Sequence, residues 1–345
     1  MAKSYCAYID HQLMIDFQGR LGPCCQFEDS SNIENYNQMI KSCITDYDSG
    51  TLPTACRQCW VDEEREIKSL RQGANEYFDR VDPNKGIVSL DIRINNHCNL
   101  ACTMCSPHAS TLWGKLKNKD SFLSLTEQQM HYVKEISNNL EMVSIQGGEP
   151  FYGNAFVDFV DQLPNKNQIS LEIFTNVISA DINKIVQWSQ EFKHVLIHAS
   201  ADGVGNLYTQ IRWPTTWQKF EDKIQRIKNI NNVSITLFYA VQSINATGIL
   251  DFINWRNSDL PNASIQFSLV NQPNCLSLYS LTDAEKSTTL ADLKDLKFSA
   301  SSQEKERIQS IVELIRTIEY NPDLVAERNE YLIRVNTLRS KHTSK

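Results

Sequence analysis

The chain has 345 residues, of which 41% are hydrophobic and 22% are charged, a composition typical of globular rather than disordered proteins. Its formal net charge is −7, so the broad basic surface that nucleic-acid binding requires is missing, and we expect no nucleic-acid partner. No stretch approaches the roughly 20 apolar residues of a membrane span, and the first residues show no secretory signal, so we expect a cytoplasmic protein with no membrane partner.

Residues 1–80 predict a small, cysteine-rich domain. Residues 9–24 have the pattern of a hairpin turned at Gln18-Gly19, and a helix is expected near Ile33–Ile44. Six of the ten cysteines fall here: Cys43 lies on the expected helix and is expected to be a small buried hydrophobe, and the other five are Cys6, Cys24, Cys25, Cys56 and Cys59. In a reducing compartment, grouped thiols indicate metal ligands or catalysts rather than disulfides.

From residue 87 onward, short β-rich runs alternate with segments of helical period. The expected strands are 87–94, 141–146, 170–176, 194–200, 233–241 and 263–270. The expected helices between them are 125–139, 156–163, 180–192, 215–230 and 248–256. This alternation is typical of βαβ units, so residues 81–275 are predicted to form a partial (β/α)6 barrel of the TIM type.

Residues 276–345 predict a C-terminal helical extension. One helix is expected over 301–320, where the apolar positions are Ile308, Ile311, Leu314, Ile315 and Ile318, and a second after Pro322. The expected fold class is therefore α/β: a partial barrel with a small N-terminal hairpin-plus-helix domain and C-terminal helices.

Three cysteines, Cys98, Cys102 and Cys105, follow the first barrel strand directly. The carboxyl ends of parallel strands are where α/β proteins build their sites. A cubane iron–sulfur cluster normally takes four thiolates, so three in one loop leave an iron open, as a catalytic metal site requires. From the residues alone, a zinc loop and three unrelated thiols remain alternatives.

The spacing Cys98-x3-Cys102-x2-Cys105 resembles the defining motif of the radical S-adenosylmethionine (SAM) superfamily. The resemblance implies that these three catalytic cysteines hold a [4Fe–4S] cluster whose open iron chelates SAM. The reduced cluster would then cleave SAM to a 5′-deoxyadenosyl radical, which abstracts a substrate hydrogen. Met104 stands where the family usually has an aromatic residue, and its backbone is expected to meet the adenine.

Later segments add to this resemblance. Gly147, Gly148, Glu149 and Pro150 resemble the family's GGEP motif, which binds the methionine amino group, although Gly147-Gly148 also suits a simple turn. The remaining expected SAM-binding residues are Asn176, Ser200, Asp202, Arg212 and Gln242, with Tyr208 beside Arg212 as a further candidate for the methionine carboxylate. Asn176 as a turn former and Arg212 as a surface cation are the alternatives.

The N-terminal cysteines Cys6, Cys24, Cys56 and Cys59 offer four thiolates, which suit a complete cubane or a structural zinc ion equally well. Their pattern resembles the twitch form of the SPASM extension, which carries an auxiliary [4Fe–4S] cluster. That extension usually follows the barrel, whereas here it precedes it. Cys25 is the alternative to Cys24 as a ligand.

The resemblance therefore implies an enzyme that oxidises, cross-links or rearranges a small-molecule or peptide substrate. The auxiliary cluster would accept the electron, and an external one-electron reductant such as flavodoxin or ferredoxin would supply the first cluster. The alternative is a non-catalytic zinc or iron–sulfur interaction module.

Overall fold

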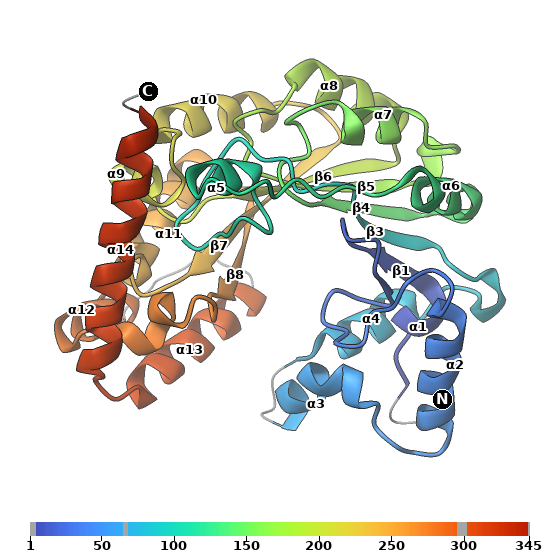
Figure 1. Cartoon of the computed structure of the whole chain (residues 1–345), viewed down its shortest axis with the longest axis horizontal. Helices are drawn as coiled ribbons and strands as arrows, with labels where there is room; N and C mark the ends of the chain where they lie inside the picture. Colours follow the sequence, from blue (N-terminus) through green and yellow to red (C-terminus); the bar gives the residue numbers. More distant parts are fainter. Residues whose placement is uncertain (1–4, 65–67, 295–301, 344–345) are drawn as a thin grey trace. The chain divides into compact units, whose positions relative to one another are not determined.

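The computed structural model describes residues 5–64, 68–294 and 302–343 (Figure 1). The chain divides into two compact units. Unit 1 comprises Met1–Asn96, Leu123–Ile173 and Glu191–His194; unit 2 comprises His97–Phe122, Phe174–Gln190 and Val195–Lys345. Residue 301 of the predicted helix 301–320, and residues 295–301 and 344–345 of the predicted extension, lie outside the described residues. Among the helices that are described, none combines the length and apolar character of a membrane span.

Unit 1 contains a sheet with the strand order β2-β1-β3-β4-β5. Its strands are β1 (Gln12–Ile15), β2 (Leu21–Gly22), β3 (Ser89–Arg93), β4 (Met142–Gln146) and β5 (Ser170–Thr175). Its helices are α1 (Tyr8–His11), α2 (Tyr36–Asp48), α3 (Arg57–Glu64), α4 (Leu70–Phe78), α6 (Glu127–Ile136) and α7 (Ala155–Asp161). Only β2 runs antiparallel to its neighbour.

The predicted N-terminal hairpin is confirmed, since β1 and β2 are joined by a turn in which Gly19 has a φ of 76°. A positive φ suits glycine because it has no Cβ. Unexpectedly, β1 also pairs in parallel with β3, so the hairpin extends the sheet of unit 1. The predicted helix begins later than expected because Ser31 bridges to Leu21 and Asn32 forms a turn with Asn35, which keeps this stretch out of α2.

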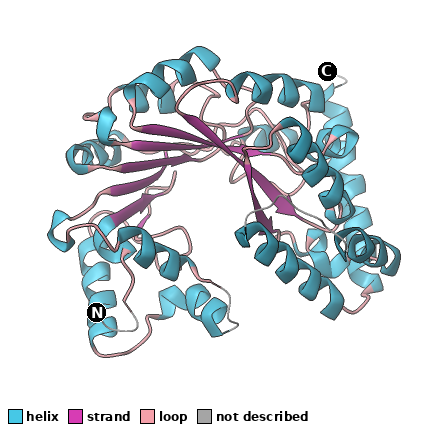
Figure 2. Cartoon of the chain, turned by 180° about the vertical axis from the view of Figure 1, so that it is seen from behind, coloured by secondary structure: helices cyan, strands magenta, loops and turns pink. Residues whose placement is uncertain are grey.

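Unit 2 contains the parallel strands β6 (His194–Ser200), β7 (Val233–Val241) and β8 (Ser264–Leu269). Its helices are α5 (Thr111–Leu116), α8 (Ile182–Glu191), α9 (Gly205–Ile211), α10 (Trp217–Ile227), α11 (Ile249–Asp259), α12 (Asp283–Lys294), α13 (Ser302–Thr317) and α14 (Pro322–Thr343). All six barrel strands predicted from the sequence are thus confirmed as β3–β8. The expected α/β class and the two C-terminal helices are confirmed as well (Figure 2).

The sheet of unit 1 has one apolar and one polar face. On β3, Leu90 and Ile92 are fully buried, while Ser89, Asp91 and Arg93 occupy the alternate positions. Because side chains of a strand alternate between faces, these three polar residues share one face. The register continues it, with Asp91 opposite Ser144 of β4 and Ser144 opposite Glu172 of β5.

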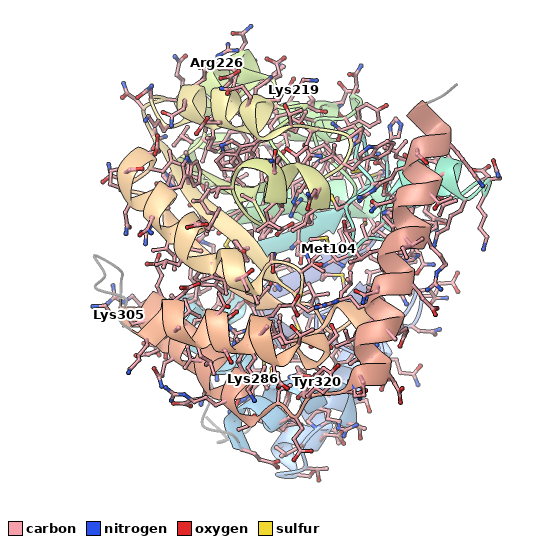
Figure 3. All side chains as sticks on the ribbon, turned by 90° about the vertical axis from the view of Figure 1, so that its left-hand side faces the viewer. Met104, Lys219, Arg226, Lys286, Lys305 and Tyr320 are labelled. Carbon is pink, nitrogen blue, oxygen red and sulfur yellow. The ribbon has the colours of Figure 1, made fainter. Side chains whose placement is uncertain are left out.

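The core of unit 2 lies between its strands and the surrounding helices. Figure 3 shows Met104 among the inner side chains, whereas Lys219 and Arg226 project outward from α10. Met104 packs against the buried cluster that contains Cys275, as do Tyr331 and Leu332 of α14. Cys275 is therefore part of a hydrophobic cluster.

A buried carboxylate, Glu304, connects α13 to helix α11 by an ion pair and to strand β8 by a hydrogen bond. The Glu304 carboxylate accepts a hydrogen bond from Arg256 Nη2 at 3.2 Å and another from the Ile265 backbone N–H at 2.6 Å. The side chains of Arg256 and Glu304 are 4% and 5% exposed. Breaking a buried pair leaves an uncompensated charge, which costs about 3 kcal/mol or more.

We therefore expect Glu304→Ala to lower the free energy of unfolding by about 3 kcal/mol, measured by denaturant unfolding. The matched control is Glu306→Ala on the same helix, since Glu306 is exposed and its loss should change stability by less than about 0.5 kcal/mol. Equal stability of the two variants would contradict this role of the ion pair.

Candidate functional site

The three-cysteine loop of unit 2 is an irregular, largely buried segment held by the start of α5. Cys98 and Cys102 are each 9% exposed and pack with Leu100, with Met104, Cys105 and Ile178 around them. The Ser110 hydroxyl caps α5 and donates to the Leu100 carbonyl at 2.6 Å. Trp113 Nε1 donates to the Cys102 carbonyl at 2.9 Å. These bonds satisfy backbone carbonyls that burial would otherwise leave unpaired.

The backbone of residues 211–213 pairs with the cysteine loop on both sides of Cys102. The backbone N–H groups of Ala101 and Thr103 donate to the carbonyls of Trp213 and Ile211, each at 2.8 Å. Arg212 lies between these two carbonyls, and its Nη1 donates to Cys102 Sγ at 3.9 Å. The structure therefore places a cation beside the central cysteine.

Arg212 is also paired with Asp202, at 2.7 Å from Nε to Oδ2. Asp202 is fully buried, and its other oxygen accepts the Ala240 N–H at 2.9 Å. These two predicted SAM-binding residues therefore lie together, and Arg212 is a paired group with a side chain that is only 11% exposed, rather than a surface cation. Tyr208 is fully buried against Trp217 and Phe220 in the core.

Burial sets the protonation of the loop thiols. It raises the pKa of Cys105 to about 12, with the neighbouring Cys102 adding to the shift. Burial also raises the pKa of Cys102, although Arg212 acts in the opposite direction. Thiols in such surroundings ionise only when a strong cation binds them, and sulfur donors in an apolar setting suit an iron–sulfur cluster.

Three further predicted residues of unit 2 lie at the ends of strands. Asn176 donates from Nδ2 to Asn99 Oδ1 at 2.8 Å, and Asn99 follows Cys98 in the cysteine loop. Gln242 is fully buried, yet neither its side-chain oxygen nor its nitrogen has a hydrogen-bond partner among the described residues. A buried unpaired amide is costly, so Gln242 fits a position that contacts a polar ligand. Ser200 ends β6, opposite Phe238 of β7.

The GGEP segment belongs to unit 1 and follows β4. Gly147 has a φ of 141°, and a Cβ there would lie 2.6 Å from the Asn95 carbonyl, so the position requires glycine. The Gly148 N–H donates to the same carbonyl at 3.1 Å. Glu149 is buried and accepts the Phe151 N–H at 3.2 Å, and Pro150 is buried next to it. The segment is thus a tight turn at the carboxyl end of a strand.

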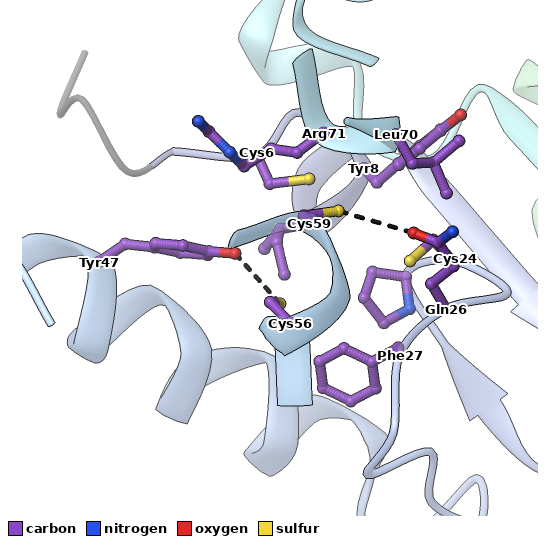
Figure 4. Close-up of a pocket in the computed structure, with 12 residues that line it drawn as sticks. Cys6, Tyr8, Cys24, Gln26, Phe27, Tyr47, Cys56, Cys59, Leu70 and Arg71 are labelled. Atoms are coloured by element: carbon purple, nitrogen blue, oxygen red, sulfur yellow. Dashed lines mark hydrogen bonds between the residues drawn. The ribbon is translucent and has the colours of Figure 1, made fainter. Parts of the chain in front are cut away.

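Four of the N-terminal cysteines line one cavity of unit 1. These are Cys6, Cys24, Cys56 and Cys59 (Figure 4). A cubane takes each thiolate at a different iron, so its cysteines must surround a space, and this set does. Cys25 does not line the cavity, although it adjoins Cys24 in sequence. Cys43 lies on α2 in the hydrophobic cluster beside it, as expected for a buried thiol.

The cavity is apolar apart from a few polar groups. The Tyr47 hydroxyl lies 3.3 Å from Cys56 Sγ, and Arg71 also lines the wall. Burial raises the pKa of Cys6 to about 12 and raises the pKa of the other three thiols as well. As in unit 2, the thiols need a bound cation to ionise.

Within the ranges 5–64, 68–294 and 302–343, no three His, Cys, Asp or Glu side chains converge closely enough to hold a single metal ion. What unites the N-terminal cysteines is the cavity that they line, and what unites the loop cysteines is their packing in one apolar cluster.

Sequence reasoning missed a buried carboxylate on the polar face of β3. Asp91 is 6% exposed; its Oδ2 accepts from Gln146 Nε2 at 3.2 Å, while its Oδ1 has no partner among the described residues. Burial raises the pKa of Asp91 to about 6; the nearby Arg93 opposes this shift, and Glu172 adds to it. The only available signal was a charged residue inside a predicted strand.

Residues 92–255 match the family model described as "Radical SAM superfamily". This part of the chain is therefore similar to the radical SAM superfamily, whose members bind a [4Fe–4S] cluster and SAM. No curated protein matches the chain.

Solved structures that are similar to the chain include the following two. One is described as "Native anSMEcpe with bound AdoMet", with 21% identity and a TM-score of 0.47 over 60% of this chain and 59% of that chain. The other is "Crystal structure of Streptococcus suis SuiB bound to precursor peptide SuiA", with 15% identity and a TM-score of 0.39 over 85% of this chain and 62% of that chain. This chain thus spans less than two thirds of the length of either protein.

The raised pKa of Asp91 predicts a pH-dependent stability. A carboxyl group that binds its proton more tightly in the folded protein stabilises the fold at low pH. This stabilisation is lost as the pH rises from 3.8, the pKa in the unfolded chain, through about 6, the pKa in the folded protein. The difference of about two units corresponds to about 3 kcal/mol. We expect Asp91→Asn to raise the unfolding midpoint relative to the wild type at pH 8, and this advantage to vanish near pH 4.

The measurement is thermal unfolding across this pH range. Asp79→Asn is the control, because Asp79 is an exposed carboxylate of the same unit. A difference between Asp91→Asn and the wild type that does not change with pH would overturn the assignment.

Proposed function

We propose that this chain is a radical SAM enzyme with two iron–sulfur clusters, the first in the Cys98–Cys105 loop and the second in the N-terminal cysteine cavity. The observation that carries the proposal is the setting of the loop within the matched family region. Two buried thiols, Cys98 and Cys102, and the partly buried Cys105 share one apolar cluster, and a cation, Arg212, donates to the central one. When bound, the first cluster and SAM supply a 5′-deoxyadenosyl radical that abstracts a substrate hydrogen.

In this proposal, Cys98, Cys102 and Cys105 hold the first cluster and leave one iron for SAM. Gln242 presents its unpaired buried amide to the cofactor, and Asn176 is held in place by Asn99. The guanidinium group of Arg212 is held beside Cys102 because its Nε donates to the Asp202 carboxylate. The remaining proposed contacts to SAM come from Met104, Gly147, Gly148, Glu149, Pro150 and Ser200.

Cys6, Cys24, Cys56 and Cys59 are proposed to hold an auxiliary [4Fe–4S] cluster. All four thiols line the same cavity, so every iron would have a protein ligand and none would remain to bind substrate. Electron transfer is then the role left for this cluster. An electron acceptor suits a reaction in which the substrate is oxidised, cross-linked or rearranged.

The substrate is proposed to be a small molecule or a peptide, and the reductant a flavodoxin or ferredoxin. SuiB is described as bound to a precursor peptide, and a peptide is one of the two kinds of substrate proposed for this chain. The domain division at residues 80 and 275, and a cytoplasmic location, remain predictions from the sequence.

The first test is reconstitution under anaerobic conditions. The protein should bind about eight irons per chain and, with dithionite and SAM, release 5′-deoxyadenosine. Cys98→Ala should abolish this product while retaining about four irons in the auxiliary site. A colourless, zinc-loaded protein that is indifferent to SAM would instead favour the non-catalytic interaction module.

The second test compares two adjacent cysteines. Cys24→Ala should lose about four irons and the absorption of one cluster, because its thiol lines the cavity. Cys25→Ala is the matched control and should retain all of the iron. The reverse result would assign the ligand to Cys25, and zinc retained in both variants would replace the auxiliary cluster by a structural zinc site.

A further inference from the structure

Helix α14 carries a buried arginine in its C-terminal part, and this arginine contacts the cysteine loop. Arg339, on α14, is 5% exposed. Its Nη2 donates to the Ala101 carbonyl at 2.6 Å and to Thr103 Oγ1 at 3.1 Å, so one nitrogen contacts residues on either side of Cys102. All of these residues belong to unit 2.

The same guanidinium reaches the segment that carries Arg212. Nη1 donates to the Gln210 carbonyl at 2.9 Å, and Nη2 lies 3.4 Å from the Ile211 carbonyl. Arg339 therefore connects the cysteine loop on both sides of Cys102 to the backbone of Gln210 and Ile211. The planar fork of arginine suits this task because it directs several donors at once, which a lysine cannot do.

The position of Arg339 is fixed by its surroundings. Its guanidinium carbon lies 6.0 Å from the Trp113 ring and 5.8 Å from the Trp213 ring. Trp113 also holds the Cys102 carbonyl, and Trp213 accepts the Ala101 N–H. Both rings thus come from residues that already contact the cysteine loop.

A second residue of α14 extends the contact. The Tyr331 hydroxyl donates to the Thr103 carbonyl at 2.8 Å. Val335 lies between Tyr331 and Arg339 in sequence, is 3% exposed and packs with Ala101 and Trp113. Residues spaced by four along a helix share a face, so one face of α14 lies along the loop.

The hydrogen bonds of Arg339 go to three carbonyls and a hydroxyl, so its charge adds to that of Arg212 near Cys102. Hydrogen bonds and net charge around an iron–sulfur cluster set its reduction potential. A cation favours the reduced form because that form carries one more negative charge.

We propose that Arg339, supported by Tyr331, is a positioning residue that holds the cysteine loop against the Arg212 segment and thereby keeps the first cluster reducible. This inference rests on the proposed function for its effect on the cluster. The positioning itself concerns only residues of this chain, so it can be tested apart from the metal.

The first measurement is amide hydrogen exchange at Ala101 and Thr103, whose N–H groups form the bonds to the Arg212 segment. In full-length protein isolated without iron, Arg339→Met should speed exchange at both amides by about tenfold or more, since buried charge-assisted hydrogen bonds are lost. Arg334→Met is the matched control. Arg334 lies on the same helix, and its side chain is 61% exposed, so its variant should exchange like the wild type.

The second measurement is the midpoint of an EPR-monitored reduction of the first cluster in the reconstituted protein. Arg339→Met should shift the midpoint to a more negative potential and lower 5′-deoxyadenosine release at fixed reductant. Arg339→Lys retains the charge but lacks the fork, so it should recover most of the potential while its loop amides still exchange faster than those of the wild type. A recovered reduction midpoint together with faster amide exchange in Arg339→Lys would not follow from a loss of stability alone.

If Arg339→Met does not fold, Tyr331→Phe provides the test, because it removes one hydroxyl and should speed exchange at the loop with little change in global unfolding. Exchange rates equal to those of Arg334→Met would overturn the positioning role. An unchanged midpoint in Arg339→Met would overturn the effect on reducibility. A protein that binds no cluster would defeat the proposed function but leave the exchange comparison valid.

Discussion

The cysteine loop imposes the strictest requirement on unit 2, because an irregular backbone that is buried must still satisfy its polar groups. The loop cannot do this within itself, and three separate elements supply the partners. Ser110 and Trp113 of α5 take up the Leu100 and Cys102 carbonyls, the segment ending α9 accepts two N–H groups, and α14 contributes Arg339 and Tyr331. Two of these three elements, the segment ending α9 and helix α14, lie more than a hundred positions away in sequence.

Both cysteine sets combine thiols with apolar surroundings. Burial raises the pKa of Cys105 and of Cys6 to about 12, so neither site is arranged for free thiolates. A bound cluster would supply the compensating positive charge and link binding to folding. The two sets differ in their cations: Arg212 donates to Cys102 in the loop, whereas Arg71 lines the N-terminal cavity. This difference suits two clusters with different electronic tasks.

Much of the fold was readable from sequence because its signals are local. The six strands from 87 to 270 and the C-terminal helices follow from periodicity, and Gly19 marked the hairpin turn. The pairing of β1 with β3 was not predicted, because a four-residue strand carries no information about its partner. The start of α2 was misplaced because a bridge from Ser31 to Leu21 competes with the helix. Local propensity does not register such long-range competition.

The sequence by itself determined which residue types are available to the candidate site. The cysteine spacing, the glycines of residues 147–148 and the order of the strands along the chain are all local properties. Only the tertiary structure decided which thiols lie together: Cys24 and Cys25 are adjacent in sequence, and Cys24 lines the cavity whereas Cys25 does not. It also decided the partners of buried charges. Asp91 and Arg339 look like ordinary charged residues in the sequence. Their roles depend on burial and on hydrogen bonds to distant backbone, because the cost of burying a charge is set by the groups that surround it.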